Sequence, residues 1–163
     1  MWLFYALVYA PAFLGAVVVV GPWLALRLRG GPMLPTSPLA IVAGAALSVA
    51  GSVVMWRCVW DFGHVGRGTP APFAAPTRHV TVGFYRRVRN PMQMGLILSL
   101  FGLAAAYMAI WILGYALAVC VCMHLFVVLY EEPTLRRKFG ESYRAYCASV
   151  PRWIPRVRRA SAA

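Results

Sequence analysis

The side chains best suited to chemistry in this chain are two adjacent glutamates, Glu131 and Glu132, in a sequence of 163 residues with only four acids. They follow an apolar run, Ile110 to Tyr130, and a second apolar run, Met92 to Met108, begins just after Arg89-Asn90-Pro91. If the two runs fold back on each other as helices, the arginine and the carboxylates meet at one end. Positive and negative groups around one hollow can bind a small zwitterionic ligand.

The basic half of this site lies in the segment Tyr85-Arg86-Arg87-Val88-Arg89-Asn90-Pro91. Proline suits the first turn of a helix, so Pro91 predicts a helix start with Asn90 as its N-cap. The amide groups of a helix start, together with Arg86 or Arg89, can bind a carboxylate. The alternative is an ordinary basic flank of a membrane helix, closed by a helix cap.

Polar residues also occur deeper in the run that ends at the glutamates. Cys120, His124 and Glu131 follow each other at spacings of four and seven, so they line one face of a regular helix. Polar groups at membrane depth usually face a cavity or a partner, and this face predicts a polar wall inside the bundle. The alternative is a histidine bonded to a neighbouring helix and glutamates solvated at the interface. Glu132 is expected to orient Arg136 or a loop arginine.

Another charged position lies inside an earlier apolar run, where Arg57 is followed one turn later by Asp61. An i, i+4 pair of opposite charge can neutralise the arginine. Trp56 and Trp60 flank it, as is typical of a membrane interface. Arg57 is therefore either an arginine that is paired with Asp61 and anchors the helix at the interface, or a residue that binds the anionic head of a substrate.

The elements that position these residues are expected to be membrane helices. The chain is 61% apolar, with a mean hydropathy of +0.69, which is more apolar than a soluble domain usually is. Runs of about 20 apolar residues predict membrane spans, and the sequence has four: Trp2–Leu26, Leu39–Trp60, Met92–Met108 and Ile110–Tyr130. Pro22 and Pro133 are expected to kink or interrupt their helices. The predicted fold is an all-α integral membrane protein with about four spans and a C-terminal helical hairpin.

The net charge of +12 indicates the topology. Five arginines lie in the loop 64–90 and eight basic residues follow position 131, so both segments are expected in the cytoplasm, together with both termini. Arg27 and Arg29 then lie outside, as a minor exception. Anionic membrane lipids are the expected partner of this charge, rather than nucleic acid. The excess of arginine over lysine suggests a GC-rich bacterial genome and hence a bacterial inner membrane.

The chain is expected to form a single domain, and its four cysteines are expected to pack in the fold rather than bind metal or form disulfides. Gly140 separates two short amphipathic helices, Thr134–Phe139 and Glu141–Val150. The predicted parts are two N-terminal spans (1–63), a cytoplasmic loop (64–90), a helical hairpin (91–130), a cytoplasmic cap (131–155) and a basic tail (156–163).

The stretch from Gly66 to Pro155 resembles the isoprenylcysteine carboxyl methyltransferase and phospholipid N-methyltransferase superfamily of integral membrane enzymes. The matching pieces are Gly66-Arg67-Gly68-Thr69-Pro70-Ala71-Pro72, Gly83-Phe84-Tyr85-Arg86, Arg89-Asn90-Pro91-Met92-Gln93-Met94-Gly95, Glu131-Glu132-Pro133-x-Leu135, Phe139-Gly140, Tyr143, Tyr146 and Val150-Pro151-Arg152. The chain departs from the usual motif at Gln93, where tyrosine is usual, and at Phe84, where proline is common.

The resemblance implies that the loop, the hairpin and the acidic motif enclose S-adenosyl-L-methionine at the cytoplasmic membrane face. Glu131 can accept hydrogen bonds from its ammonium or ribose hydroxyl groups, and a tyrosine can face the adenine or the sulfonium. The predicted cofactor-binding residues are Tyr85, Arg86, Arg89, Asn90, Pro91, Gly95, His124, Tyr130, Glu131, Glu132 and Tyr146. The predicted catalytic residues are Arg57 and His124.

The implied reaction is methyl transfer to a lipophilic or small apolar acceptor that enters from the lipid. Two alternatives stay open at this point. The first is an NADPH-dependent membrane reductase of related fold, in which the loop arginines bind the phosphates. The second is a small membrane protein without catalytic activity.

Overall fold

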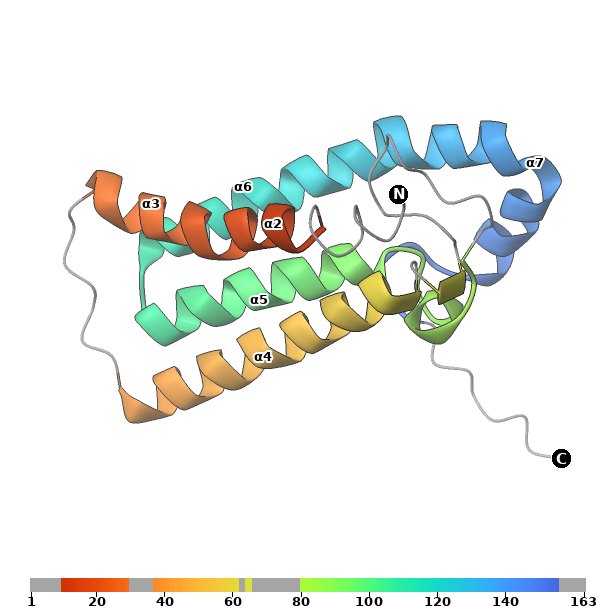
Figure 1. The fold of residues 1–163 in the computed structure, drawn as a ribbon. Helices are drawn as coiled ribbons and strands as arrows, with labels where there is room; N and C mark the ends of the chain where they lie inside the picture. Colours follow the sequence, from red (N-terminus) through yellow and green to blue (C-terminus); the bar gives the residue numbers. More distant parts are fainter. Residues whose placement is uncertain (1–9, 30–36, 62–63, 66–79, 156–163) are drawn as a thin grey trace, which may run out of the picture.

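Helices account for nearly all of the chain that the computed structural model describes, residues 10–29, 37–61, 64–65 and 80–155. The helices in chain order are α2 (Ala10–Gly15), η2 (Ala16–Val20), α3 (Gly21–Arg29), α4 (Pro38–Asp61), η5 (Gly83–Arg86), α5 (Pro91–Tyr107), α6 (Ile110–Phe126), η6 (Val127–Glu131) and α7 (Glu132–Ser149). In Figure 1, α4 packs along α5, α5 along α6, and α3 along α6, and no strand occurs within these ranges. The all-helical prediction is confirmed.

A seam of small residues brings α4 and α5 close together. Gly51 on α4 and Gly95 on α5 face each other so closely that a Cβ added at Gly95 would lie 2.6 Å from the carbonyl oxygen of Gly51. Gly44 and Gly102 repeat this contact seven residues along each helix. Small residues let helix backbones approach where no side chain has to be accommodated. The seam therefore fixes α5 against α4.

The turn between α5 and α6 lies where the sequence predicted it. Met108 ends α5 in the left-handed region, with φ 45° and ψ 37°, and Ala109 is extended before α6 begins at Ile110. Ile112, just inside α6, is fully buried. Ile112 forms a buried cluster with Ala104 and Ala109, and Leu26 from α3 packs against it. The hairpin therefore turns tightly and returns α6 along α5.

Both prolines that were expected to kink or interrupt helices directly follow a break in the regular α-helix, since η2 separates α2 from α3 and η6 separates α6 from α7. Pro133 lies in the first turn of α7, and the chain stays helical through both breaks. Each proline comes two residues after a π-helical segment. The N–H of Gly21 donates to the carbonyl of Ala16, and that of Glu132 donates to Val127, five residues back in each case. A proline ring clashes with the carbonyl four residues earlier in a regular α-helix. The wider π turn relieves this clash, so Pro22 and Pro133 are accommodated.

Two helices are long and apolar enough to cross a membrane: α4, with 24 residues, and the continuous helix from Ile110 to Ser149, with 40. Helical segments Ala12–Arg27 and Pro91–Tyr107 are apolar but shorter. The predicted run Leu39–Trp60 thus corresponds closely to α4, and the predicted hairpin to α5 and α6. Four apolar helical segments thus occur in the described residues where four spans were predicted, and two of them are long enough to cross a membrane; the number of spans stays a prediction.

The C-terminal part folds back toward the start of α5. Gly140 has φ 56° and ψ −127° and kinks α7, as expected for a glycine that separates two helices. Beyond the kink, Tyr143, Tyr146 and Val150 form a small buried cluster. The backbone N–H of Arg89 donates to the carbonyl of Pro151 at 2.9 Å. This part of the chain therefore lies beside the residues that precede α5.

Candidate functional site

Glu132, the first residue of α7, is the centre of a buried ion cluster. Arg152 donates to both its carboxylate oxygens, from Nε at 2.7 Å and from Nη2 at 2.9 Å. Arg89 donates to Oε1 from Nη1 at 2.9 Å, and Arg136 lies 3.7 Å away. The hydrogen bonds to Glu132 raise the pKa of Arg152 above its ordinary value. We call Glu132, Arg89 and Arg152 the ion cluster. The expectation that Glu132 orients arginines is confirmed.

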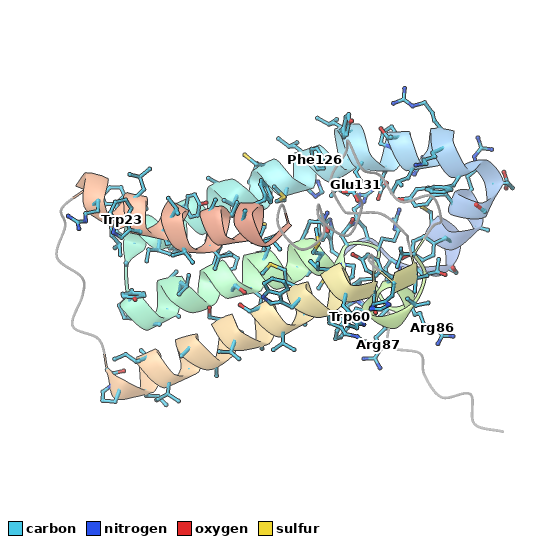
Figure 2. All side chains as sticks on the ribbon, viewed as in Figure 1. Trp23, Trp60, Arg86, Arg87, Phe126 and Glu131 are labelled. Carbon is cyan, nitrogen blue, oxygen red and sulfur yellow. The ribbon has the colours of Figure 1, made fainter. Side chains whose placement is uncertain are left out.

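Glu131, its neighbour, lies in a different environment. It ends the π segment η6 and lies on the side of the helix that faces α5 (Figure 2). Gln93, one turn into α5, donates from Nε2 to Glu131 Oε2 at 3.1 Å. Within the described part of the chain, this amide is its one hydrogen-bond partner and it forms no ion pair. Glu131 is half-buried and keeps acceptor capacity for a ligand.

These contacts test the central expectation from the sequence. The Gln93–Glu131 and Arg89–Glu132 bonds join the start of α5 to the junction of α6 and α7. The hairpin therefore brings guanidinium and carboxylate groups to one end, as predicted.

The start of α5 is only partly as predicted. Pro91 occupies the first turn and is buried, and Asn90 occupies the N-cap position. The Asn90 side chain does not cap the helix, and that part of the prediction was wrong. Its Nδ2 instead donates to the carbonyl oxygen of Arg152 at 3.3 Å. The reason is that the returning C-terminal segment offers an acceptor beside Asn90, and the first amides of α5 remain without a side-chain cap.

Two of the predicted tyrosines are part of the buried framework. Tyr146 donates its hydroxyl hydrogen to the carbonyl oxygen of Tyr85 at 2.7 Å, and both residues are buried. Burial raises the pKa of Tyr85 well above its ordinary value, so its phenol stays protonated. The same phenol hydrogen-bonds with Cys58 on α4. These contacts join η5 to α4 and α7, close to the candidate site.

Two other predicted cofactor residues have exposed side chains. Tyr130 directly precedes Glu131, but its side chain is exposed and packs against Phe126, with ring centroids 5.2 Å apart. Arg86 is also exposed, and Figure 2 shows it beside Arg87 and Trp60, apart from Glu131. No hydrogen bond or ion pair joins either side chain to the glutamates within the described residues.

Gly95 and Arg57 contact residues of α4 rather than the acidic pair within the described structure. Gly95 belongs to the seam with α4 and faces Gly51 rather than the acidic pair. Arg57 lies 3.5 Å from Asp61, which confirms the expected i, i+4 pair. The Arg57 side chain is 58% exposed, whereas Asp61 is buried against Gly83. Arg57 is therefore available to a ligand at the surface of α4.

His124 is exposed on α6 and contacts Trp153, with ring centroids 6.0 Å apart. The π segment η6 lies between His124 and Glu131. Cys120 and His124 lie one turn apart in regular α6, whereas the wider turns of η6 change the angular spacing between them and Glu131, whose side chain bonds to Gln93 on α5.

The sequence analysis did not assign Gln93, Arg152 or Trp153 to the site. Gln93 was noted only where a tyrosine is usual, and Arg152 only as part of the resemblance. A usable signal was present, because a buried carboxylate needs cationic partners and the chain offers several arginines near its C-terminal end. The contact of Trp153 with His124 has no such signal, since it depends on how the chain turns after α7. The glycine-rich stretch 66–72 lies outside the described residues.

The comparison with protein families agrees with this geometry. The profile of the phospholipid methyltransferase family matches residues 39–142, a region that includes α4, α5, α6 and the acidic pair. No match was found among curated proteins. Because the matched region covers well over half of the sequence, the chain belongs to the phospholipid methyltransferase family.

Proposed function

We propose that the protein transfers a methyl group from S-adenosyl-L-methionine to a lipophilic or small apolar acceptor at the cytoplasmic face of a membrane. Membership of the phospholipid methyltransferase family makes it a methyltransferase. The cofactor and the class of acceptor are inferred from the site. The observation that carries them is the state of Glu131, a half-buried carboxylate with an amide partner and no cation among the described residues.

The donor groups of the cofactor fit this carboxylate. S-adenosylmethionine has an ammonium group and two ribose hydroxyl groups, and a carboxylate accepts hydrogen bonds from either. Gln93 holds one oxygen of Glu131 at 3.1 Å and thereby orients the other. The carboxylate of the cofactor fits the uncapped start of α5, where amide groups and the helix dipole favour an anion. The described residues thus offer complementary groups for both ends of the amino-acid moiety.

When bound, the cofactor supplies an electrophilic methyl group that transfers in a single in-line displacement. The protein's contribution is to place the two reactants and to exclude water. The ion cluster around Glu132 holds the start of α5 and the C-terminal segment in fixed positions around Glu131. His124, exposed on α6, can accept a proton at an imidazole nitrogen when the acceptor is an amine. Arg57 is placed to bind an anionic head of the acceptor at the surface.

The same proposal includes a multi-pass arrangement in a bacterial inner membrane, with both termini in the cytoplasm. The long apolar helices α4 and Ile110–Ser149 support it. Arg86 and Arg87 are exposed at the end of the molecule that carries the acidic pair, where anionic lipid headgroups attract basic side chains. The acceptor then reaches the site sideways from the lipid.

The test is isothermal titration of the detergent-purified protein with S-adenosylhomocysteine and, separately, with NADPH. We expect binding of the first in the micromolar range and no binding of the second. Glu131→Gln should weaken binding of S-adenosylhomocysteine about tenfold or more, because hydrogen bonds to a charged group contribute roughly 1.5–3 kcal/mol. The matched control is Glu141→Gln, since Glu141 is exposed and, among the described residues, pairs with Arg144 on the same helix. Binding of NADPH alone would overturn the proposal in favour of a reductase.

A further inference from the structure

Trp153 lies in the short segment that returns from α7 to the start of α5, and the residues before it are held firmly. The carbonyl of Pro151 accepts from the backbone of Arg89 at 2.9 Å. Arg152 is held at both ends, through its guanidinium on Glu132 and through its carbonyl, which accepts from Asn90. Trp153 therefore follows an anchored residue, and its position is set by the ion cluster.

The ring of Trp153 reaches α6, where it meets the imidazole of His124 at 6.0 Å between centroids and 36° between planes. His124 is exposed and Trp153 is partly exposed. The pair thus joins the C-terminal segment to α6 while leaving aromatic surface accessible.

The anchoring also attaches the segment that carries Trp153 to the start of α5, which binds Glu131. Asn90, which binds the carbonyl of Arg152, and Gln93, which binds Glu131, are three residues apart at the start of α5. Residues at this spacing are neighbours on one side of a helix. The C-terminal segment and Glu131 are therefore attached to the same turn.

The three tyrosines expected to face the cofactor make other contacts within the described structure. The Tyr146 hydroxyl donates to the carbonyl of Tyr85, the Tyr85 phenol bonds to Cys58, and Tyr130 packs on Phe126 at the exposed side of the helix. Trp153 instead follows residues that are anchored to Arg89, Asn90 and Glu132.

We propose that Trp153, supported by His124, presents its ring to the sulfonium group of the bound cofactor. This inference rests on the proposed function. Tryptophan is the side chain that attracts a cation most strongly through its ring face. The negative charge that would favour this cation is that of Glu131, which has an amide partner and no cationic partner in the described structure, whereas Glu132 is already paired with Arg89 and Arg152. Trp153 is thus a residue that distinguishes the charged cofactor from its neutral product.

The test compares S-adenosylmethionine, which carries the sulfonium charge, with S-adenosylhomocysteine, which is neutral at sulfur. Isothermal titration of the full-length protein in detergent gives both affinities for the wild type, Trp153→Ala and Trp153→Phe. We expect Trp153→Ala to weaken binding of S-adenosylmethionine roughly 3- to 30-fold while binding of S-adenosylhomocysteine changes less than about twofold. Trp153→Phe should keep most of the preference, because it keeps an aromatic face.

Retained binding of the neutral product serves as the control for folding. Trp60→Ala is the matched control, since Trp60 is exposed on α4 and its ring contacts His64, and it should change neither affinity. An equal loss for both ligands in Trp153→Ala, or no loss for either, overturns the assignment of Trp153 and leaves the proposed function standing. If the wild type binds neither ligand, the proposed function fails and the assignment fails with it.

Discussion

Glu131 and Glu132 are adjacent and chemically identical, yet the structure places them in two unlike regions. Glu132 faces the C-terminal segment, where Arg152 and Arg89 occupy both its oxygens. Glu131 faces α5 and has an amide from Gln93. The difference comes from what lies across from each carboxylate, since successive helix positions point about 100° apart. A paired acid can hold structure together, whereas an acid without a cation is available to a ligand.

The two regions depend on each other. The ion cluster joins three parts of the chain that are distant in sequence: the segment before α5, the start of α7 and the residues after α7. Glu131 is the residue next to Glu132, and Gln93 follows Arg89 by four residues. The cluster therefore sets the distance between α5 and the α6–α7 junction, and Glu131 lies in the space so defined.

The strongest way to separate the two regions is Glu132→Gln. This change leaves Arg89 and Arg152 without their carboxylate, and breaking a buried ion pair costs about 3–5 kcal/mol when both partners are fully buried. Because the Arg152 side chain is 32% exposed, we expect a smaller loss, about 2–4 kcal/mol. Thermal unfolding in detergent micelles should show a clearly lower midpoint. Glu131→Gln is the control and should move the midpoint little; equal shifts for the two variants would contradict the division of roles.

The second variant, Gln93→Arg, is designed to make the surroundings of Glu131 resemble those of Glu132. Gln93→Arg places a guanidinium group opposite Glu131 and gives that carboxylate the kind of partner that Glu132 already has. We expect the affinity for S-adenosylhomocysteine to fall about tenfold or more, because the acceptor oxygens are then occupied by a charged donor. The unfolding midpoint should stay level or rise slightly. Gln93→Glu is the charge control, because it places a second carboxylate opposite Glu131 and cannot form an ion pair with it. An unchanged affinity in Gln93→Arg would show that Glu131 does not bind the ligand.

Much of this arrangement could be predicted from the sequence, because it follows from apolar patterning. The run Leu39–Trp60 became α4 and the break near Ala109 became the hairpin turn. The scarcity of acids pointed to Glu131 and Glu132, and the spacing of Arg57 and Asp61 predicted their pair. Each of these signals is local or depends on composition.

The parts that could not be predicted depend on contacts between distant segments. Asn90 fits the N-cap pattern, but the carbonyl of Arg152 lies within reach and its side chain donates there instead. Pro133 normally breaks a helix, but the π turn before it accommodates the ring. The roles expected for Tyr85 and Tyr146 required knowing that they bond to each other. Sequence spacing does not show such partners in advance.

A smaller effect is expected from Tyr146→Phe, which tests how the ion cluster's surroundings are braced. The change removes the hydroxyl that donates to the carbonyl of Tyr85 at 2.7 Å and keeps the ring. A typical hydrogen bond contributes about 1 kcal/mol, so thermal unfolding should report a loss of that size. Affinity for S-adenosylhomocysteine should change less than in the Gln93→Arg variant. A large loss of affinity with no loss of stability would instead place the Tyr146 hydroxyl in contact with the ligand, as the sequence first suggested.

The smallest effect on stability is expected at Arg57, which carries a charge pair outside both regions. Its guanidinium is mostly exposed and 3.5 Å from the buried Asp61, and because solvent screens the exposed partner, the pair is expected to contribute about 1 kcal/mol or less. Arg57→Ala should therefore lower the unfolding midpoint only slightly and leave S-adenosylhomocysteine binding unchanged, because Glu131 and Gln93 are intact. If Arg57 binds the head of the acceptor, methyl transfer at subsaturating acceptor should still fall, through a higher KM. Turnover equal to that of the wild type would make Arg57 an anchor at the surface of α4, and the acceptor's headgroup would have to be sought nearer the glutamates.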